Sequence, residues 1–99
     1  MINSPLLPHL QGYIAGRWTA GSAKGEIVVI NPADGSELAR IPAMGAAETE
    51  DAVAAANQAL NQPIDLETRR RWLKRIAEVL LENKEELGRI LTLEHGKPW

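Results

Sequence analysis

Residues 65–99 read DLETRRRWLKRIAEVLLENKEELGRILTLEHGKPW, and this stretch carries the strongest structural signal in the chain of 99 residues. Its large apolar residues recur every three or four positions, which places them on one face of a helix. These residues are Trp72, Leu73, Ile76, Val79 and Leu80. Asp65 is a suitable N-cap, and Gly96 followed by Pro98 is typical of a helix end. We therefore predict a helical segment between Asp65 and Gly96 with a buried apolar stripe.

The apolar pattern pauses around residues 82–86, where Asn83 and Glu86 have the spacing of a capping box. A new apolar run follows, with Leu87, Ile90 and Leu91. We predict a kink or a restart of the helix at Asn83. In the first turns, Glu67 precedes Arg71 by four residues, a spacing at which opposite charges support an exposed helix face.

An earlier helix is indicated from about residue 47, because small and apolar residues recur there with helical spacing. They are Ala52, Val53, Ala56, Ala59 and Leu60. Ala47, which we place at the cap position of this helix, has no side-chain oxygen, so we predict a loss of about 1 kcal/mol unless Thr49 replaces that cap. Pro63 separates this helix from the next one, and helices are thus expected within residues 47–95.

The first half of the chain has the pattern of short strands. Residues 12–42 contain two runs, around Tyr13 to Trp18 and at Glu26 to Ile30, which we interpret as one antiparallel hairpin with AGSAKGE (residues 20–26) as its loop. Asn31 to Gly35, NPADG, is a strong turn signal, and Glu37 to Ile41 is expected to be a third short strand ended by Pro42. Residues 1–11, with two prolines and no periodicity, are expected to be a flexible arm. The fold class predicted is therefore α+β.

Composition excludes several classes of protein. Hydrophobic residues make up 44% and charged residues 24%, which is typical of a globular chain, and the formal net charge is −2. This charge favours neither nucleic acid nor an anionic membrane as a partner. No apolar run approaches the roughly 20 residues that a membrane helix needs. The chain has no cysteine, which excludes disulfides and fits a reducing cytoplasm.

Three groups of residues are candidates for functional sites. Arg69, Arg70, Arg71, Lys74 and Arg75 surround Trp72, but residues 65–99 hold eight basic and seven acidic side chains, so a solvated helix face is favoured over a nucleic-acid surface. His9 and His95 lack partners at metal-ligand spacing. Glu94 and Lys97 flank Gly96, where fixing the path of the chain is favoured over acid–base chemistry.

No glycine-rich phosphate loop is present either. Five of the glycines, at positions 12, 16, 21, 25 and 35, are spread over turns, and none stands between a strand and a helix in the GxGxxG order that cradles a pyrophosphate. We therefore expect this chain alone to bind no dinucleotide and to contain no catalytic residue.

Four blocks of sequence occur together in the order typical of one enzyme family. They are GYIAGRWTAG (residues 12–21), VVINPADGSELARIP (28–42), AVAAANQAL (52–60) and TLEHGKPW (92–99). Together they resemble the opening segment of an NAD(P)-dependent aldehyde dehydrogenase. The combination of MGAAETEDAV (residues 44–53) with LTLEHGKPW is similar to the succinate-semialdehyde dehydrogenases in particular.

The resemblance implies an N-terminal part, residues 12–99, of a cofactor-binding domain in an α/β fold. It implies a cytoplasmic homo-oligomer that oxidises an aldehyde to a carboxylate with NAD or NADP. The cysteine nucleophile of that reaction would lie outside these residues. This chain alone would then be inactive, and its partner would be the remainder of the enzyme. It also implies that the main-chain carbonyl of Ile30 could be one ligand of a monovalent cation. The alternative is a stand-alone, non-enzymatic helical module whose exposed apolar face docks a partner protein.

Overall fold

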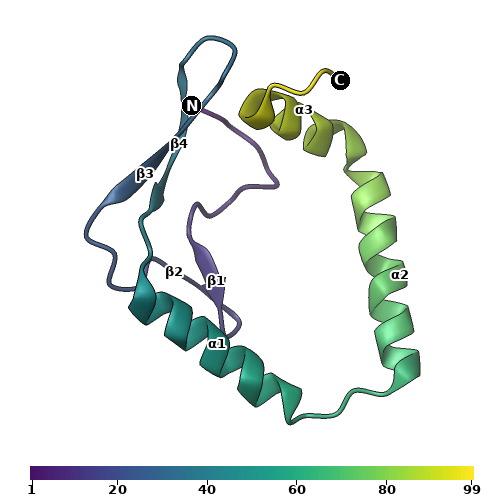
Figure 1. Ribbon diagram of the computed structural model, residues 1–99. Coiled ribbons are helices and arrows are strands. Elements are labelled where there is room, and N and C mark those ends of the chain that lie inside the picture. Colours follow the sequence, from purple (N-terminus) through teal and green to yellow (C-terminus); the bar gives the residue numbers. More distant parts are fainter.

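The computed structural model describes all 99 residues and contains four strands followed by three helices. The elements are β1 (Gly12–Ile14), β2 (Arg17–Thr19), β3 (Glu26–Ile30), β4 (Glu37–Pro42), α1 (Ala46–Leu60), α2 (Leu66–Glu82) and α3 (Lys84–His95). They follow one another around an open ring: α1 leads away from the strands, α2 forms the opposite side, and α3 returns toward the β3–β4 hairpin (Figure 1). The predicted α+β class is confirmed. No helix has the length and apolar character required to span a membrane.

The strands form two separate antiparallel hairpins, so the single hairpin with AGSAKGE as its loop was a wrong prediction. β1 pairs with β2 through a tight turn at Ala15 and Gly16, whose φ angles are 51° and 77°. This turn is hard to predict from the sequence, because alanine rarely adopts a positive φ. Residues 20–25 instead connect the two sheets, and Glu26 already belongs to β3.

The second hairpin, β3–β4, closes at NPADG, where the sequence predicted a turn but not this strand pairing. The Asn31 carbonyl accepts a hydrogen bond from the Gly35 N–H at 2.8 Å, and Gly35 has a φ of 73°. The Asp34 carboxylate accepts from both the N–H and the hydroxyl of Ser36. Side chains that bond to nearby backbone in this way are the reason that Asn and Asp favour turns.

Helix α1 begins at Ala46, with Gly45 as its N-cap. The prediction that Ala47 stands at the cap position was wrong, because Ala47 already lies inside the first turn. Thr49 does not replace a cap either, since its hydroxyl donates to the Gly45 carbonyl at 3.0 Å. The Glu48 carboxylate instead accepts from the Gly45 N–H at 2.8 Å.

Helix α2 begins as predicted: the Asp65 carboxylate accepts a hydrogen bond from the Thr68 N–H at 2.7 Å. The predicted restart at Asn83 is also confirmed, since α2 ends at Glu82 and α3 starts at Lys84. The capping box was wrong, because the Asn83 side chain donates back to the Val79 carbonyl at 2.9 Å. At the far end, Gly96 caps α3 with a left-handed φ of 74°.

Two glutamates, one from the predicted Glu67–Arg71 pair and one from the predicted capping box, pair instead with the arginine three residues further along the chain. Glu67 binds Arg70, not Arg71, at 2.7 Å. Glu86, the other member of the expected capping box, binds Arg89 at 2.6 Å. Both carboxylates face the guanidinium one turn further along the helix, where its two N–H groups reach both oxygens.

The buried core is very small. Leu38 and Ala39 of β4 are the only buried apolar residues, with 7% and 5% of their surface exposed. The apolar stripe of α2 is uncovered, with Trp72 at 55%, Ile76 at 54% and Leu80 at 52% exposure, so its predicted burial does not occur within this chain. The stripe has helical spacing as expected, but nothing in these 99 residues packs against it.

Candidate functional site

The Glu48 carboxylate in the first turn of α1 is both buried and hydrogen-bonded to three donors. One oxygen accepts from the N–H and the hydroxyl of Ser22, at 2.7 and 2.5 Å. The other oxygen accepts from the Gly45 N–H at 2.8 Å. Glu48 is buried, with 6% of its surface exposed. A buried carboxylate is tolerated here because three donors replace the water it loses.

These donors also determine the charge state of Glu48. The Ser22 hydroxyl, then the Ser22 and Gly45 N–H groups, lower the pKa of the carboxyl from 4.5 to about 2. Donors that bond to the ionised form favour that form. Glu48 is therefore a fixed anion that joins the β2–β3 connection to α1, and it is not suited to exchange protons near neutral pH.

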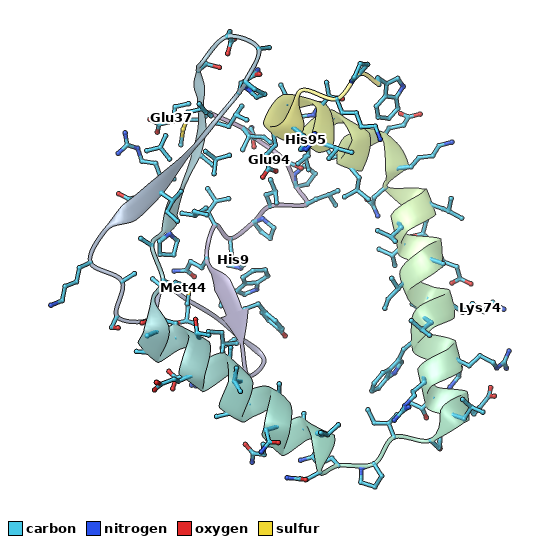
Figure 2. The ribbon with its side chains drawn as sticks, in the orientation of Figure 1. His9, Glu37, Met44, Lys74, Glu94 and His95 are labelled. Carbon is cyan, nitrogen blue, oxygen red and sulfur yellow. The ribbon has the colours of Figure 1, made fainter.

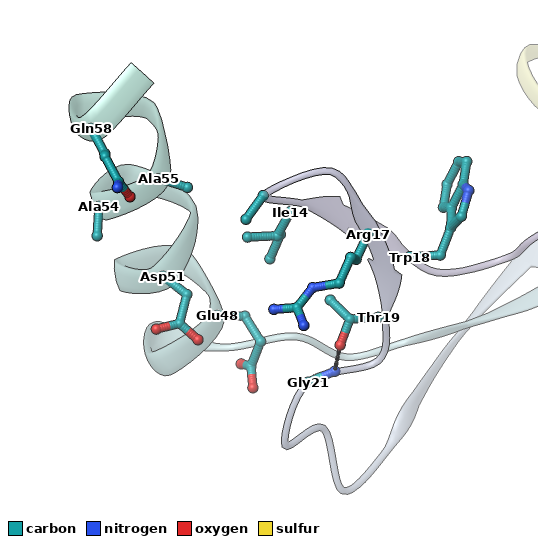
Figure 3. Close-up of a pocket in the computed structure, with 11 residues that line it drawn as sticks. Ile14, Arg17, Trp18, Thr19, Gly21, Glu48, Asp51, Ala54, Ala55 and Gln58 are labelled. Atoms are coloured by element: carbon teal, nitrogen blue, oxygen red, sulfur yellow. Dashed lines mark hydrogen bonds between the residues drawn. The ribbon is translucent and has the colours of Figure 1, made fainter. Parts of the chain in front are cut away.

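A groove lies between the β1–β2 hairpin and α1, next to this anchor (Figure 3). Its walls combine small apolar side chains with a few charged and polar ones: Ile14, Arg17, Asp51, Ala54, Ala55 and Gln58. Figure 3 shows the Arg17 guanidinium between the hairpin and the first turns of α1. The groove contains neither a nucleophile beside a base nor a set of metal-ligating residues, so it offers no catalytic constellation.

The two histidines lie on different elements. His9 stands in the arm and stacks on Trp18 with ring centroids 5.1 Å apart, and Tyr13 packs on the same ring at 5.0 Å. His95 lies at the end of α3 (Figure 2). No group of three or more His, Cys, Asp or Glu side chains is arranged to hold a metal ion.

Glu94 and Lys97 are both exposed and form no ion pair with each other. An exposed carboxylate lacks the enclosure that acid–base catalysis requires. The local structure is set by Gly96, whose N–H donates to the Thr92 carbonyl at 2.9 Å and closes the helix.

The basic cluster of α2 is partly neutralised by its own helix. Arg70 binds Glu67, and Arg75 lies 3.5 Å from Glu78 and 3.3 Å from Glu82. Lys74 points outward, away from the ring (Figure 2). These contacts are those of a solvated helix face, and exposed pairs of this kind contribute little to stability.

Ile30 is the last residue of β3, next to an irregularity in the register between Val29 and Ile30. Its carbonyl would supply a single oxygen, whereas hard cations are held by several. The 99 residues therefore do not form a cation site by themselves, and the role of Ile30 stays a prediction.

The residues present do not fit a dinucleotide. The one strand-to-helix junction is β4 to α1, where a pyrophosphate would need free N–H groups at the helix start. The Gly45 N–H there already donates its hydrogen bond to the Glu48 carboxylate, whose negative charge would repel a phosphate.

Comparison with known proteins identifies the protein family. Residues 18–99 match the aldehyde dehydrogenase family. The chain belongs to that family. This aldehyde dehydrogenase chain is similar to the 3-sulfolactaldehyde dehydrogenase of Pseudomonas putida, with 45% identity over 98% of this chain and 20% of the relative. It is also 36% identical to the succinate-semialdehyde dehydrogenase [NADP(+)] GabD of Escherichia coli strain K12, over 98% of this chain and 20% of that protein.

A solved structure shares the whole arrangement. An oxidoreductase from Marinobacter aquaeolei superposes with a TM-score of 0.90 at 50% identity, covering 100% of this chain and 21% of that one. The aldehyde dehydrogenase chain thus spans about a fifth of the length of the proteins it matches. The family resemblance drawn from the four sequence blocks is confirmed.

Sequence reasoning missed the Glu48–Ser22 anchor. The available signal was the spacing of Gly45 and Glu48, which has the form of a helix cap followed by an acid three residues later. Nothing in the sequence indicated that Ser22 would be the second partner, because it lies in a connection between two sheets.

Proposed function

We propose that these 99 residues are the N-terminal part of the cofactor-binding domain of an NAD(P)-dependent aldehyde dehydrogenase, and that they support the domain without taking part in the chemistry. The observation that carries this proposal is the uncovered apolar stripe of α2 on a ring that matches 21% of a longer oxidoreductase. Large exposed apolar faces mark surfaces that pack against something else.

The nucleophile and the cofactor site belong, in this proposal, to other parts of the enzyme. The 99 residues contain no cysteine, the nucleophile that this family uses, and the α1 N-terminus is occupied by Glu48. When bound, NAD or NADP accepts the hydride that oxidation of the aldehyde releases. The residues described here would hold α1 and the two hairpins in place against that domain.

The substrate class we propose is an aldehyde that carries an acidic group, with succinate semialdehyde as the leading candidate. The names of similar proteins support it. Malonate-semialdehyde dehydrogenase 2 of Geobacillus thermodenitrificans is 40% identical over 89% of this chain. The 3-sulfolactaldehyde and succinate-semialdehyde dehydrogenases are similar to it as well. Each of these substrates joins an aldehyde to a carboxylate or a sulfonate.

We also propose a cytoplasmic homo-oligomer, which the absence of cysteine and the exposed faces support.

The test uses protein made from the complete reading frame that contains these residues. It is assayed with succinate semialdehyde, malonate semialdehyde and 3-sulfolactaldehyde, each with NAD and with NADP, and butanal serves as the uncharged control. We expect reduced cofactor with at least one acidic aldehyde and much slower turnover of butanal. Absence of turnover with all three acidic aldehydes would refute the proposed activity. The 99-residue chain alone, purified in parallel, should give none.

The second candidate is a non-enzymatic module that docks a partner through the stripe of α2. The exposure of Trp72 and Ile76 favours it, because both side chains are large, apolar and uncovered. The reading frame separates the two proposals. A frame that continues into a glycine-rich nucleotide turn and a cysteine supports the enzyme, whereas a frame without them supports the module.

A further inference from the structure

The N-terminal arm connects two elements that otherwise approach each other only near their ends. It starts beside the β3–β4 hairpin and runs beneath α3 before it turns back to β1 (Figure 1). The Ile2 N–H donates to the Leu38 carbonyl of β4 at 2.6 Å. The next residue, Asn3, accepts with its carbonyl from the Arg89 guanidinium of α3 at 2.8 Å. Two consecutive arm residues thus bind a strand and a helix.

Ser4 continues this contact. It is buried, with 8% of its surface exposed, although it belongs to a segment that the sequence predicted to be flexible. Its hydroxyl and carbonyl accept from the N–H groups of Leu6 and Leu7, which folds the arm into a turn. Arg89 and, to a lesser extent, the Ser4 hydroxyl lower the pKa of Glu86 to about 2, so this carboxylate is an anion facing the arm.

The arm crosses the best-packed part of the chain. Leu38, which accepts from Ile2, is one of the two buried apolar residues. The other approach between α3 and the strands is at the end of the helix, where a Cβ on Gly96 would lie 3.1 Å from the Pro32 ring. At its other end, α3 is joined to α2 through Asn83, where the helix is interrupted.

We propose that residues 1–4 are a strap that fixes α3 against the β3–β4 hairpin, with Arg89 as the positioning residue on the helix. With the strap in place, α3 cannot pivot at Asn83, and the segment 94–99 that follows the helix keeps its direction. Release of the strap would free α3 and loosen β4 at Leu38, while leaving α1, α2 and the β1–β2 hairpin intact. This inference does not depend on the proposed enzyme activity.

Hydrogen exchange followed by mass spectrometry tests the strap in protein made from the complete reading frame. One variant lacks residues 2–4, and a second is Arg89→Gln. The matched control is Arg70→Gln, which removes an arginine from an equivalent pair three residues apart that the arm does not touch. We expect deletion of the strap to speed exchange about tenfold in both 37–42 and 84–95, since the arm's hydrogen bonds to the Leu38 carbonyl and to the charged Arg89 side chain are lost.

Arg89→Gln should speed exchange in 84–95 and should also increase thermolysin cleavage within residues 5–10. Arg70→Gln should change neither. The strap is refuted if the deletion leaves exchange in 84–95 unchanged, or if it affects 37–42 alone. It is also refuted if Arg89→Gln changes its own helix no more than Arg70→Gln changes α2. If Arg89→Gln does not fold, the deletion variant decides.

Discussion

Glu48 and Ser22 are 26 residues apart in the sequence, yet the Glu48 carboxylate accepts two hydrogen bonds from Ser22, at 2.7 and 2.5 Å. The same carboxylate accepts from the Gly45 N–H at the start of α1. One side chain thus caps a helix and holds the connection between two sheets. A group with both functions should be more sensitive to substitution and to pH than an ordinary surface glutamate.

We predict that Glu48→Gln destabilises the protein at neutral pH and removes part of its acid sensitivity. The pKa of Glu48 is lowered from 4.5 to about 2, so its stabilising contribution is complete above 4.5 and is lost as the pH falls toward about 2. Thermal unfolding of both proteins, followed at neutral pH and at several values below 4.5, measures the difference. The two proteins should become more alike as the pH falls, and a difference that stays constant with pH would contradict this.

Gly21→Ala should be more destabilising than Gly16→Ala. Both glycines have a positive φ, of 60° at Gly21 and 77° at Gly16. In this left-handed conformation, each alanine should lower the free energy of unfolding by about 1 kcal/mol. A Cβ at Gly21 would also lie 2.6 Å from a Glu48 carboxylate oxygen, whereas a Cβ at Gly16 meets nothing within 4 Å. We expect a further loss of about 1–2 kcal/mol at Gly21 in urea unfolding. Equal losses of unfolding free energy at the two positions would contradict this, because they would mean that the Glu48 side chain moves aside without cost.

Asp65→Ala should shorten α2 at its first turn. The carboxylate that accepts from the Thr68 N–H is lost, and the capping principle predicts a fall in the unfolding midpoint of roughly 5 °C for a chain of this size. Asp51→Ala, on α1, is the control, because no hydrogen bond or ion pair of that carboxylate is present in the structure. Circular dichroism during heating gives both midpoints, and similar shifts for the two variants would argue against the cap.

The isolated 99-residue chain should self-associate through the stripe of α2, because Trp72, Ile76 and Leu80 are each more than half exposed. Ile76→Lys places a charge in the middle of this stripe and should shift the sedimentation distribution toward monomer. Lys74→Gln, on the outward face of the same helix (Figure 2), should not change it. A compact monomer of the unmodified chain at high concentration would contradict the prediction.

Local features of the structure were largely readable from the sequence. The Asp65 cap, the interruption at Asn83, the Gly96 helix end and the NPADG turn each depend on residues within about five positions of one another. Hydrogen bonds and φ preferences at that range are properties of the residues themselves. The capping box at Asn83 failed because the same asparagine can bond to the preceding turn instead, and composition does not decide between the two.

The sequence by itself thus determined the helices, the ends of α2 and α3, the family and the absence of a cysteine nucleophile within these residues. Tertiary structure alone decided which strands pair, that Glu48 meets Ser22, and that the arm joins β4 to α3. The physical reason is that these contacts join residues far apart in the chain, whose pairing depends on how whole elements pack. The same reason explains the stripe of α2: its period is a local property, but its burial needs a partner surface that these 99 residues do not supply.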